Sequence, residues 1–400
     1  MRPKSFMLIA GETSGDLLGA DLVRALRAES ARAEAVPTND YQPLYTSFEP
    51  RFFGAGGPKM AEAGVELSFD MTKHSVIGLS DALRHYFQFR RLFKELFRLA
   101  LERQPDVIIC IDFAGFNRRF AGAIRRYING RQDWFHDWKP RIVQYVSPQV
   151  WASRPGRAYD MAHVYDLLLV TFPFEKEWYA KRVPNFRVEF VGQPLADRYP
   201  AAPVSNEQKA KAPSLLLLPG SRRGEIKRHV PVLLSALQLV SAQIPVQARM
   251  ILPNQHLIDL TREFGPPPDL QMQCGGLEEA LTSATVAIAK TGTVTLECAW
   301  FGVPTVTLYK TSLFTYEIGK RIVKVNSLTM PNLLAKEHVF PEFIQDEASP
   351  GNIANAALEL LRDEAKRVKI KARLREIIEA LGGPGASARA ARAIVSLMPS

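Results

Sequence analysis

Short apolar runs alternate with longer amphipathic stretches along the whole chain. The apolar runs are often bounded by Pro or Gly, which predicts buried parallel strands with helices between them. A polar stretch rich in Pro and Ala, residues 198–213, separates two sets of such runs. The runs lie at residues 5–10, 105–113, 141–146, 166–172 and 186–192, and then at 214–220, 246–252, 269–274, 285–290 and 304–309. The pattern therefore predicts an α/β protein with two Rossmann-like, doubly wound domains.

The predicted domains span residues 1–197 and 198–380, and a helical tail is expected over residues 381–400. Ligands of open α/β sheets bind beyond the carboxyl ends of the strands. We therefore expect the two sheets to face a central cleft that is lined by the turns following the strands. Residues 34–51 and 129–139 have the composition of loop insertions in the first domain.

Composition narrows the class of partner. The 400 residues carry 51 Lys and Arg against 41 Asp and Glu, a formal charge of +10, which favours nucleic acid, anionic lipid or a phosphorylated substrate. The spacing of Cys, His and Asp matches no metal motif, so we expect neither a metal nor a cofactor. The three cysteines, Cys110, Cys274 and Cys298, are expected to be small core residues.

Targeting signals are not evident in the sequence. No run approaches the roughly 18 apolar residues of a membrane span. The first apolar stretch, of five or six residues, is too short for the core of a signal peptide. We therefore expect a cytoplasmic protein that is soluble or peripheral.

Two turns of the first predicted domain carry chemically useful residues. In the glycine turn 10–16, the following helix N-terminus attracts anions, but Glu12 and Asp16 repel phosphate. A tight turn capped by Ser14 or Asp16 is the alternative. Asp112 ends the most apolar strand of this domain, where burial can raise its pKa toward that of a general base. An N-cap for the next helix is the alternative role of Asp112.

Two turns of the second predicted domain suit a nucleotide. Residues 218–225 place small residues and Arg222 before a helix, which suits a diphosphate, or else forms a capped Arg-rich turn. Residues 289–297 open another helix, where Thr293 can hold phosphate and Glu297 can accept both hydroxyls of a ribose. In the alternative, Thr291 and Thr293 are only helix caps and Glu297 only interacts with the helix dipole.

Ten stretches of the chain, in order, resemble the lipid-A-disaccharide synthases, GT-B glycosyltransferases of Gram-negative bacteria. They run over roughly residues 8–336: AGETSGDLLGA, GAGGPKM, SVIGLSDAL, ICIDFAGFN, YVSPQVWASR, FPFEKEWY, FVGQPLAD, LLPGSRRGEI, AKTGTVTLEC and SLTMPNLLA. Three positions depart from the family pattern. Gly115 replaces an acidic residue, which leaves Asp112 as the carboxylate of that motif. Gln193 replaces a histidine and Ser153 replaces a tryptophan.

The resemblance implies an inverting, metal-independent transfer of 2,3-diacylglucosamine from its UDP donor to 2,3-diacylglucosamine 1-phosphate. The products would be the β(1→6) disaccharide 1-phosphate and UDP. Asp112 is the implied base for the acceptor 6-hydroxyl. The implied substrate-binding residues are Glu12, Ser14, Arg222, Thr293, Glu297 and Asn332. A UDP-sugar 2-epimerase of the same architecture remains an alternative, although Gln193 in place of histidine counts against it. A basic membrane- or nucleic-acid-binding protein without catalysis is the other alternative.

Positive charge gathers beside apolar residues in the first domain. Residues 84–103 hold six basic and two acidic residues along an apolar helical stripe. Such a helix can lie in an anionic membrane interface, or it packs its stripe on the sheet. The residues we assign to membrane association are Phe89, Phe93, Phe97, Arg91 and Lys94, and Val76, Ile77 and Leu79 would extend the apolar surface.

A second basic zone, residues 118–157, contains nine basic and two acidic residues together with Trp134, Phe135, Trp138 and Trp151. This composition suits a phospholipid interface, and no recognised nucleic-acid module occurs there. We therefore expect anionic inner-membrane phospholipids as partners, with no nucleic acid, and a peripheral location on the cytoplasmic face of that membrane.

Overall fold

The computed structural model describes residues 4–34, 49–71, 82–131, 137–199, 212–323 and 325–398. Most of the predicted insertion 34–51, part of the insertion 129–139, and Val76, Ile77, Leu79, Trp134 and Phe135 lie outside these residues. The chain divides into two compact units, residues 1–198 with 381–400 and residues 199–380. The segment predicted as a separate tail therefore belongs to the first unit. None of the described helices is both long and apolar enough to cross a membrane.

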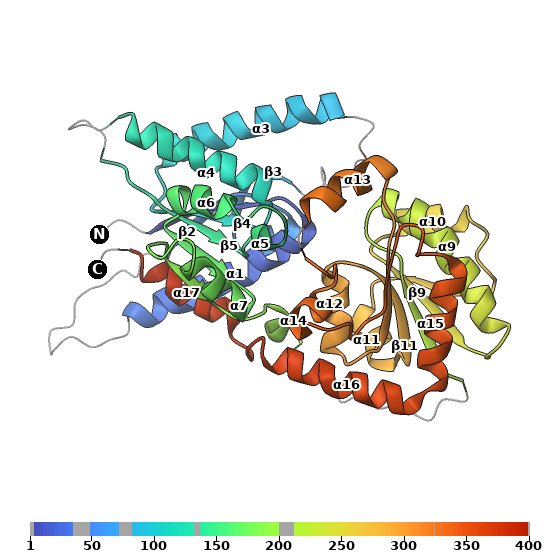
Figure 1. The fold of residues 1–400 in the computed structure, drawn as a ribbon. Coiled ribbons are helices and arrows are strands. Elements are labelled where there is room, and N and C mark those ends of the chain that lie inside the picture. The colour runs from blue at the N-terminus through green and yellow to red at the C-terminus, as the bar shows by residue number, and fades with distance from the viewer. Residues whose placement is uncertain are drawn as a thin grey trace. The chain divides into compact units, whose positions relative to one another are not determined.

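The first unit contains a seven-stranded parallel sheet (Figure 1). Its order is β3-β2-β1-β4-β5-β6-β7, so the direction of winding reverses between β1 and β4. The strands are β1 (Ser5–Ala10), β2 (Arg51–Gly56), β3 (Glu66–Asp70), β4 (Val107–Ile111), β5 (Arg141–Tyr145), β6 (Leu167–Val170) and β7 (Val188–Phe190). The point of reversal is where a doubly wound sheet normally binds its ligand.

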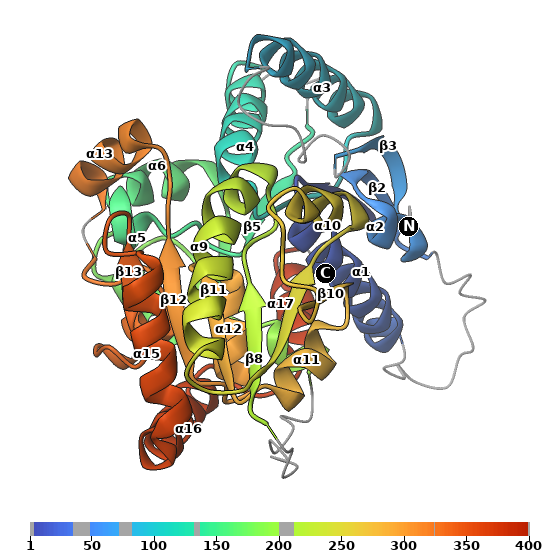
Figure 2. The same cartoon turned by 90° about the vertical axis from the view of Figure 1, so that its right-hand side faces the viewer.

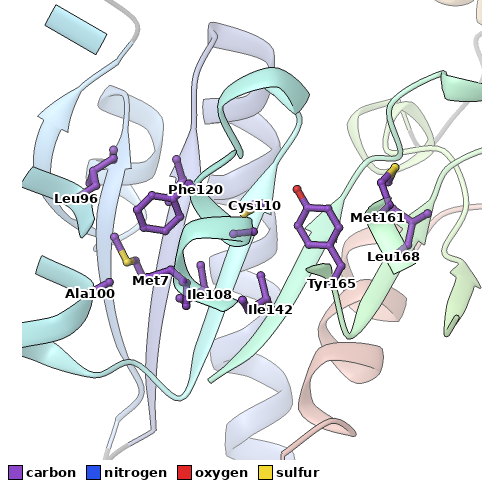
Figure 3. Packing of buried hydrophobic residues seen from close by; sticks show 14 of the residues in the cluster. Met7, Leu96, Ala100, Ile108, Cys110, Phe120, Ile142, Met161, Tyr165 and Leu168 are labelled. Carbon is purple, nitrogen blue, oxygen red and sulfur yellow. The ribbon is translucent and has the colours of Figure 1, made fainter. Parts of the chain in front are cut away.

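Both faces of this sheet are covered by helices, which explains why its central strands are apolar throughout. In β1, Met7 packs into the hydrophobic cluster on one face and Leu8 into the cluster on the other. Figure 3 shows part of the first cluster, in which Phe120 and Leu96 pack over Met7. The helices of the unit are α1 (Thr13–Glu34), α2 (Pro58–Glu62), α3 (Ala82–Arg103), α4 (Ala114–Asn129), α5 (Val150–Ser153), α6 (Arg157–Val164), α7 (Pro173–Ala180), α8 (Leu195–Arg198) and α17 (Ala386–Val395).

The last helix, α17, returns to the first unit and packs against α1. Ile394 of α17 is fully buried in the same cluster as Leu22 and Leu26 of α1. The Asp197 carboxylate accepts the backbone N–H groups of Ala386 at 3.1 Å and Ser387 at 2.8 Å, which caps the start of α17. The final segment of the chain thus completes the core of the unit that begins at the N-terminus.

The second unit repeats the architecture with six parallel strands in the order β10-β9-β8-β11-β12-β13 (Figure 2). Its strands are β8 (Ser214–Leu218), β9 (Gln247–Leu252), β10 (Gln271–Cys274), β11 (Val286–Lys290), β12 (Thr305–Tyr309) and β13 (Glu342–Ile344). Its helices are α9 (Arg223–Ser241), α10 (Gln255–Arg262), α11 (Leu277–Ser283), α12 (Thr293–Trp300), α13 (Leu313–Ile322), α14 (Met330–Ala335), α15 (Pro350–Arg362) and α16 (Glu364–Glu379). Here the winding reverses between β8 and β11. The predicted pair of doubly wound sheets is confirmed.

The expected burial of the three cysteines is confirmed for two of them. Cys110 and Cys298 are buried, but Cys274 is exposed. Cys274 ends β10, an edge strand that has a neighbour on one side only, so its apolar sequence context did not lead to burial.

Candidate functional site

The structure brings Glu12, Ser14 and Asp112 to the same edge of the first sheet. Ala10 of β1 pairs with Ile111 of β4, so the turns that follow these two strands emerge side by side. A Cβ atom on Gly11 would lie 2.2 Å from the Phe113 ring, so only glycine allows the two turns to approach this closely. Glu12 is half-buried and Ser14 is exposed.

Asp112 lies on a turn with a rare backbone conformation. Asp112 and Phe113 have φ values of +47° and +43°, and Val146 after the neighbouring strand β5 has φ +66°. Each such non-glycine residue costs about 1–3 kcal/mol, and such strain persists only where surrounding contacts enforce it. The N-cap of α4 is Phe113, so the alternative role of Asp112 as an N-cap is not observed.

Two buried side-chain amides enforce this conformation. Asn117 donates from Nδ2 to the Asp112 carbonyl at 2.9 Å, and Gln144 donates from Nε2 to the same carbonyl at 3.2 Å. Gln144 also donates to the carbonyl of Val146 at 3.1 Å, which joins the turns after β4 and β5. The Asp112 side chain is therefore presented from a backbone that is fixed on two sides. Asn117 and Gln144 were not among the predicted site residues, because their targets are carbonyls created by the turn geometry.

Asp16 has a structural role. It is buried, and its carboxylate accepts the backbone N–H groups of Gly57 at 2.8 Å, Lys59 at 3.0 Å and Met60 at 2.9 Å. These bonds cap α2, whereas in the alternative interpretation of the glycine turn Ser14 or Asp16 capped that turn itself. Asp16 thus holds α2 against α1.

In the second unit, a salt bridge joins the turns after β8 and β11. Lys290 Nζ lies 2.9 Å from Glu225 Oε1, and Glu225 Oε2 accepts the backbone N–H groups of Ser221 at 2.9 Å and Arg222 at 3.2 Å. Burial opposes ionisation of Glu225, but the Lys290 ammonium and the hydrogen bonds outweigh it and hold the pKa of that carboxyl below its ordinary value. Gly220, with φ +123°, leaves the space that the Glu225 carboxylate occupies.

Arg222 is therefore the N-cap residue of α9, and its side chain is exposed. Sequence reasoning missed Glu225 and Lys290. A glutamate three residues after the N-cap is half of the capping-box signature, but Arg222 lacks the side-chain oxygen that completes it, so the sequence signal was only partial.

Thr293 and Glu297 lie on α12, immediately after β11. Thr293 is exposed at the first position of the helix, and Glu297 follows one turn later and is buried. Gly292 is the N-cap residue, and no side chain caps this helix. The alternative in which Thr291 and Thr293 are caps is therefore not observed. Because β8 and β11 are paired, Arg222, Thr293 and Glu297 all follow the two strands at the reversal point of the second sheet.

His229 is a buried residue of this region that the sequence did not reveal. Its Nδ1 lies 2.7 Å from the Pro219 carbonyl, and its Nε2 accepts the backbone N–H of Lys310 at 3.1 Å. Burial lowers the pKa of His229, so the neutral ring bridges the turns after β8 and β12.

The structure gives Asn332 a supporting position. Its side chain is buried, Nδ2 donates to the Phe340 carbonyl and to Glu342 Oε1, both at 2.8 Å, and Oδ1 accepts the Phe340 N–H at 2.8 Å. The same Glu342 carboxylate accepts the N–H groups of Leu328 and Thr329. The amide of Asn332 thus fixes the segment 328–342 through bonds within the unit, and its implied part in the donor site stays a prediction.

The apolar stripe of α3 packs against α4. Ring centroids lie 5.7 Å apart for Phe93 and Phe116, 6.5 Å for Phe97 and Phe120, and 6.1 Å for Phe89 and Phe113. The three α3 phenylalanines are half-buried in this way. The apolar stripe is therefore packed within the protein, as in the alternative to a membrane interface. The Arg91 and Lys94 side chains of the same helix are exposed to solvent.

The three departures from the family pattern lie in the first unit. Gly115 is exposed in the first turn of α4, with no atom within 4 Å of where its Cβ would be. Gln193 is buried, and Ser153 ends α5 and is half-buried. An acidic side chain at residue 115 would therefore have had room, and its absence leaves the first turn of α4 without a carboxylate.

Comparisons with known proteins agree over nearly the whole chain. The family model described as lipid-A-disaccharide synthetase matches residues 6–395. The lipid-A-disaccharide synthase of Geobacter sulfurreducens is 37% identical over 412 residues, covering 98% of this chain and 97% of that protein. The enzyme of the same name from Trichlorobacter lovleyi is 34% identical over 409 residues, covering 99% and 98%.

Solved structures share the two-sheet architecture at low sequence identity. MurG from Acinetobacter baumannii covers 98% of this chain and 100% of its own, with a TM-score of 0.53 and 14% identity. A UDP-GlcNAc 2-epimerase from Neisseria meningitidis, bound to UDP-GlcNAc, covers 99% and 100%, with a TM-score of 0.60 and 8% identity. At these identities the likeness concerns the fold, which is that of GT-B glycosyltransferases and epimerases.

Proposed function

Since the chain belongs to the lipid-A-disaccharide synthetase family, and so is a hexosyltransferase of lipid A biosynthesis, we propose its substrates and its mechanism. It transfers 2,3-diacylglucosamine from the UDP donor to 2,3-diacylglucosamine 1-phosphate. The products are the β(1→6) disaccharide 1-phosphate and UDP, and the anomeric configuration is inverted. The 2-epimerase alternative has only the shared fold in its favour.

The observation that supports the proposal most is the position of Asp112. Its carboxylate follows β4 at the reversal point of the first sheet, on a turn fixed by Asn117 and Gln144. A base must be held rigidly to take a proton in the transition state. In the proposed step, Asp112 takes the proton of the acceptor 6-hydroxyl while that oxygen bonds to the donor anomeric carbon. The bond from this carbon to the UDP oxygen breaks, and its electron pair leaves with UDP.

The second unit would bind the donor. The exposed Arg222 guanidinium at the start of α9 and the Thr293 hydroxyl at the start of α12 suit the diphosphate, whose negative charge grows as UDP leaves. Glu297, one turn further along α12, would accept the ribose hydroxyls. The salt bridge between Lys290, at the end of β11, and Glu225, in the first turn of α9, holds the starts of α9 and α12 in a fixed relative position. Asn332 would then support this site by fixing the segment 328–342, and in the first unit Glu12 and Ser14 would contact the acceptor.

We also propose that the enzyme is peripheral at the cytoplasmic face of the inner membrane, because both substrates are acylated. Arg91 and Lys94 on α3 are exposed and suited to anionic phospholipid headgroups. Phe89, Phe93 and Phe97 would shape the apolar side of this region from their packed positions beside α4.

The proposal is tested by incubating the full-length protein with both substrates in neutral detergent micelles. We expect disaccharide 1-phosphate and UDP in equal amounts. The variant Asp112→Asn is expected to lower kcat by about 10²- to 10⁴-fold, because the base is lost, with the Kd for UDP changed less than about twofold.

Asp259→Asn, at an exposed ion pair on α10, is the matched control and should behave as wild type. Wild-type enzyme that releases no UDP and makes no disaccharide would refute the proposed reaction. Loss of UDP affinity in Asp112→Asn would refute the role of Asp112 as base.

A further inference from the structure

The basic zone 118–157 contains a pocket that the proposed mechanism does not use. The pocket lies in the first unit between the start of α4, the end of β5 and α6. Two of its walls are arginine side chains, Arg118 from α4 and Arg157 from the first residue of α6, and both are half-buried. Other residues of its lining are Ala114, Gln144, Pro148 and Tyr165.

Positive charge at this pocket exceeds the nearby negative charge. Burial, followed by repulsion from Arg154 and Arg118, lowers the pKa of the Arg157 guanidinium, and the Asp160 carboxylate acts against this. Asp160 also lies 3.4 Å from Arg118, and its side chain is 57% exposed, which weakens its effect. An anion between the two guanidiniums would relieve this repulsion and could accept paired hydrogen bonds from each.

The geometry around the pocket also favours an anion. The first turn of α4 contains no acidic residue, so the positive end of the helix dipole is not neutralised there. Gly115 leaves open space at the same turn. The cavity has a volume of about 20 Å³, enough for one water-sized group, so a larger anion would lie at its mouth beside the two arginines.

Gln144 connects this pocket to Asp112. Its Nε2 donates to the Asp112 carbonyl at 3.2 Å, while its side chain lines the pocket. Its Oε1 is buried and has no hydrogen-bond partner among the described residues. A buried carbonyl oxygen is normally paired, so this atom indicates a missing donor such as a ligand hydroxyl or a bound water. Gln144 thus joins the lining of the pocket to the backbone of the Asp112 turn.

We propose that Arg118 and Arg157 bind a phosphate monoester, the 1-phosphate of the sugar acceptor, and so orient that acceptor with its hydroxyl at Asp112. The identity of the ligand rests on the proposed function, whereas the phosphate chemistry follows from the residues. An anionic phospholipid headgroup offers related chemistry, so the experiment must distinguish these two sources.

The test uses full-length Arg118→Gln, Arg157→Gln and the double variant. Glucosamine 1-phosphate, which has no acyl chains, is titrated calorimetrically, and KM is measured for acceptor and donor in neutral micelles. We expect the double variant to raise the Kd for glucosamine 1-phosphate and the acceptor KM by at least about 30-fold, since two charge-assisted contacts are lost. The donor KM should change by less than about twofold.

Arg126→Gln is the matched control, because it removes the same charge from an exposed position on the same helix. An equal effect of Arg126→Gln would show that only net charge matters and would overturn the proposal. Unchanged affinity of the double variant for glucosamine 1-phosphate would also overturn it. The proposal would likewise be overturned if the double variant lost only its sedimentation with phosphatidylglycerol vesicles, because the arginines would then bind lipid headgroups.

A wild-type protein that makes no disaccharide but binds glucosamine 1-phosphate through Arg118 and Arg157 would refute the proposed function and leave the phosphate site standing. If a glutamine variant does not fold, modification of wild-type arginines by phenylglyoxal, mapped by mass spectrometry, decides the question. Inorganic phosphate should slow modification of Arg118 and Arg157 but not of Arg126. Equal modification with and without phosphate would overturn the proposal.

Discussion

At the scale of single residues, Glu175 is a carboxylic acid buried in the first unit. It lies in the first turn of α7 and is buried, with Oε1 accepting from Trp151 Nε1 and Oε2 from the Phe172 N–H, both at 3.1 Å. Burial raises the pKa of Glu175 from 4.5 to about 7, because the hydrogen bonds do not fully replace water around the charge. Glu175 is therefore a buried acid that titrates near neutral pH.

This pKa predicts a pH-dependent stability. The folded state binds the proton more tightly than the unfolded state, so the free energy of unfolding should fall as pH rises from 4.5 to about 7. The loss attributable to Glu175 is on the order of 3 kcal/mol. Denaturant unfolding at pH 5, 6, 7 and 8 should show this component in wild type and not in Glu175→Gln. Glu177→Gln, at an exposed pair with Lys181, is the control, and parallel curves for wild type and Glu175→Gln would contradict the prediction.

At the scale of elements, α3 shows what apolar spacing can and cannot predict. The spacing of Phe89, Phe93 and Phe97 correctly predicted an amphipathic helix. It could not predict whether the apolar stripe packs against lipid or against protein, because the spacing is the same in both cases. The partner of the stripe, α4, is set by the tertiary fold. From the sequence, the apolar stripe and the basic face of α3 were both assigned to the membrane. In the structure the stripe packs against α4, and only the basic face is exposed.

This separation predicts different effects for two substitutions on α3. Phe93→Ala should lower the free energy of unfolding by about 2–3 kcal/mol, because its ring packs against Phe116 and Phe120. Replacing both Arg91 and Lys94 by Gln should leave stability within about 0.5 kcal/mol and weaken binding to anionic vesicles by about 30-fold, at about 1 kcal/mol per charge.

The matched control for the charges is the pair Lys369→Gln and Arg375→Gln on α16, which changes the net charge equally. Chemical denaturation and vesicle sedimentation measure the two effects. Equal vesicle binding by the α3 and α16 variants would argue against α3 as the contact.

The candidate site shows the same limit of sequence reasoning. Asp112, Arg222 and Glu297 could be found because each lies near the carboxyl end of a predicted strand, where ligands of α/β sheets bind. The residues that fix these turns could not be found in this way. Asn117 and Gln144 act on carbonyls that exist only once the chain adopts positive φ, and Lys290 reaches Glu225 across 65 residues of sequence. The hydrogen bonds of the Asn332 amide likewise exist only in the folded segment 328–342.

At the scale of the whole molecule, the chain does not divide at one point into two halves. The first unit needs α17, whose apolar face is buried against α1. The Pro- and Ala-rich composition near residue 200 predicted the linker. The sequence of the short Ala- and Arg-rich helix α17, however, has no feature that assigns it to one unit or the other. The second unit, residues 199–380, includes no segment of the final helix.

Removing residues 381–400 should therefore damage the first unit and spare the second. We expect the truncated chain to lose protease resistance within residues 4–198 while its Kd for UDP changes less than about threefold, because the residues proposed to bind UDP belong to the second unit, which contains none of the removed segment. Ile394→Ala is the milder variant and should cost about 3 kcal/mol in full-length protein. Arg392→Gln, on the exposed face of α17, is the control. Full protease resistance of the truncated chain would contradict the prediction.

The return of α17 also sets an order of events during synthesis. Domains of multidomain proteins generally fold from the N-terminus as they leave the ribosome. Here the core around Leu22 and Leu26 is not complete until α17 has been translated, whereas the second unit ends some 20 residues earlier. The unit whose synthesis begins first therefore has its core completed last, and until then the α1 surface that α17 covers stays exposed.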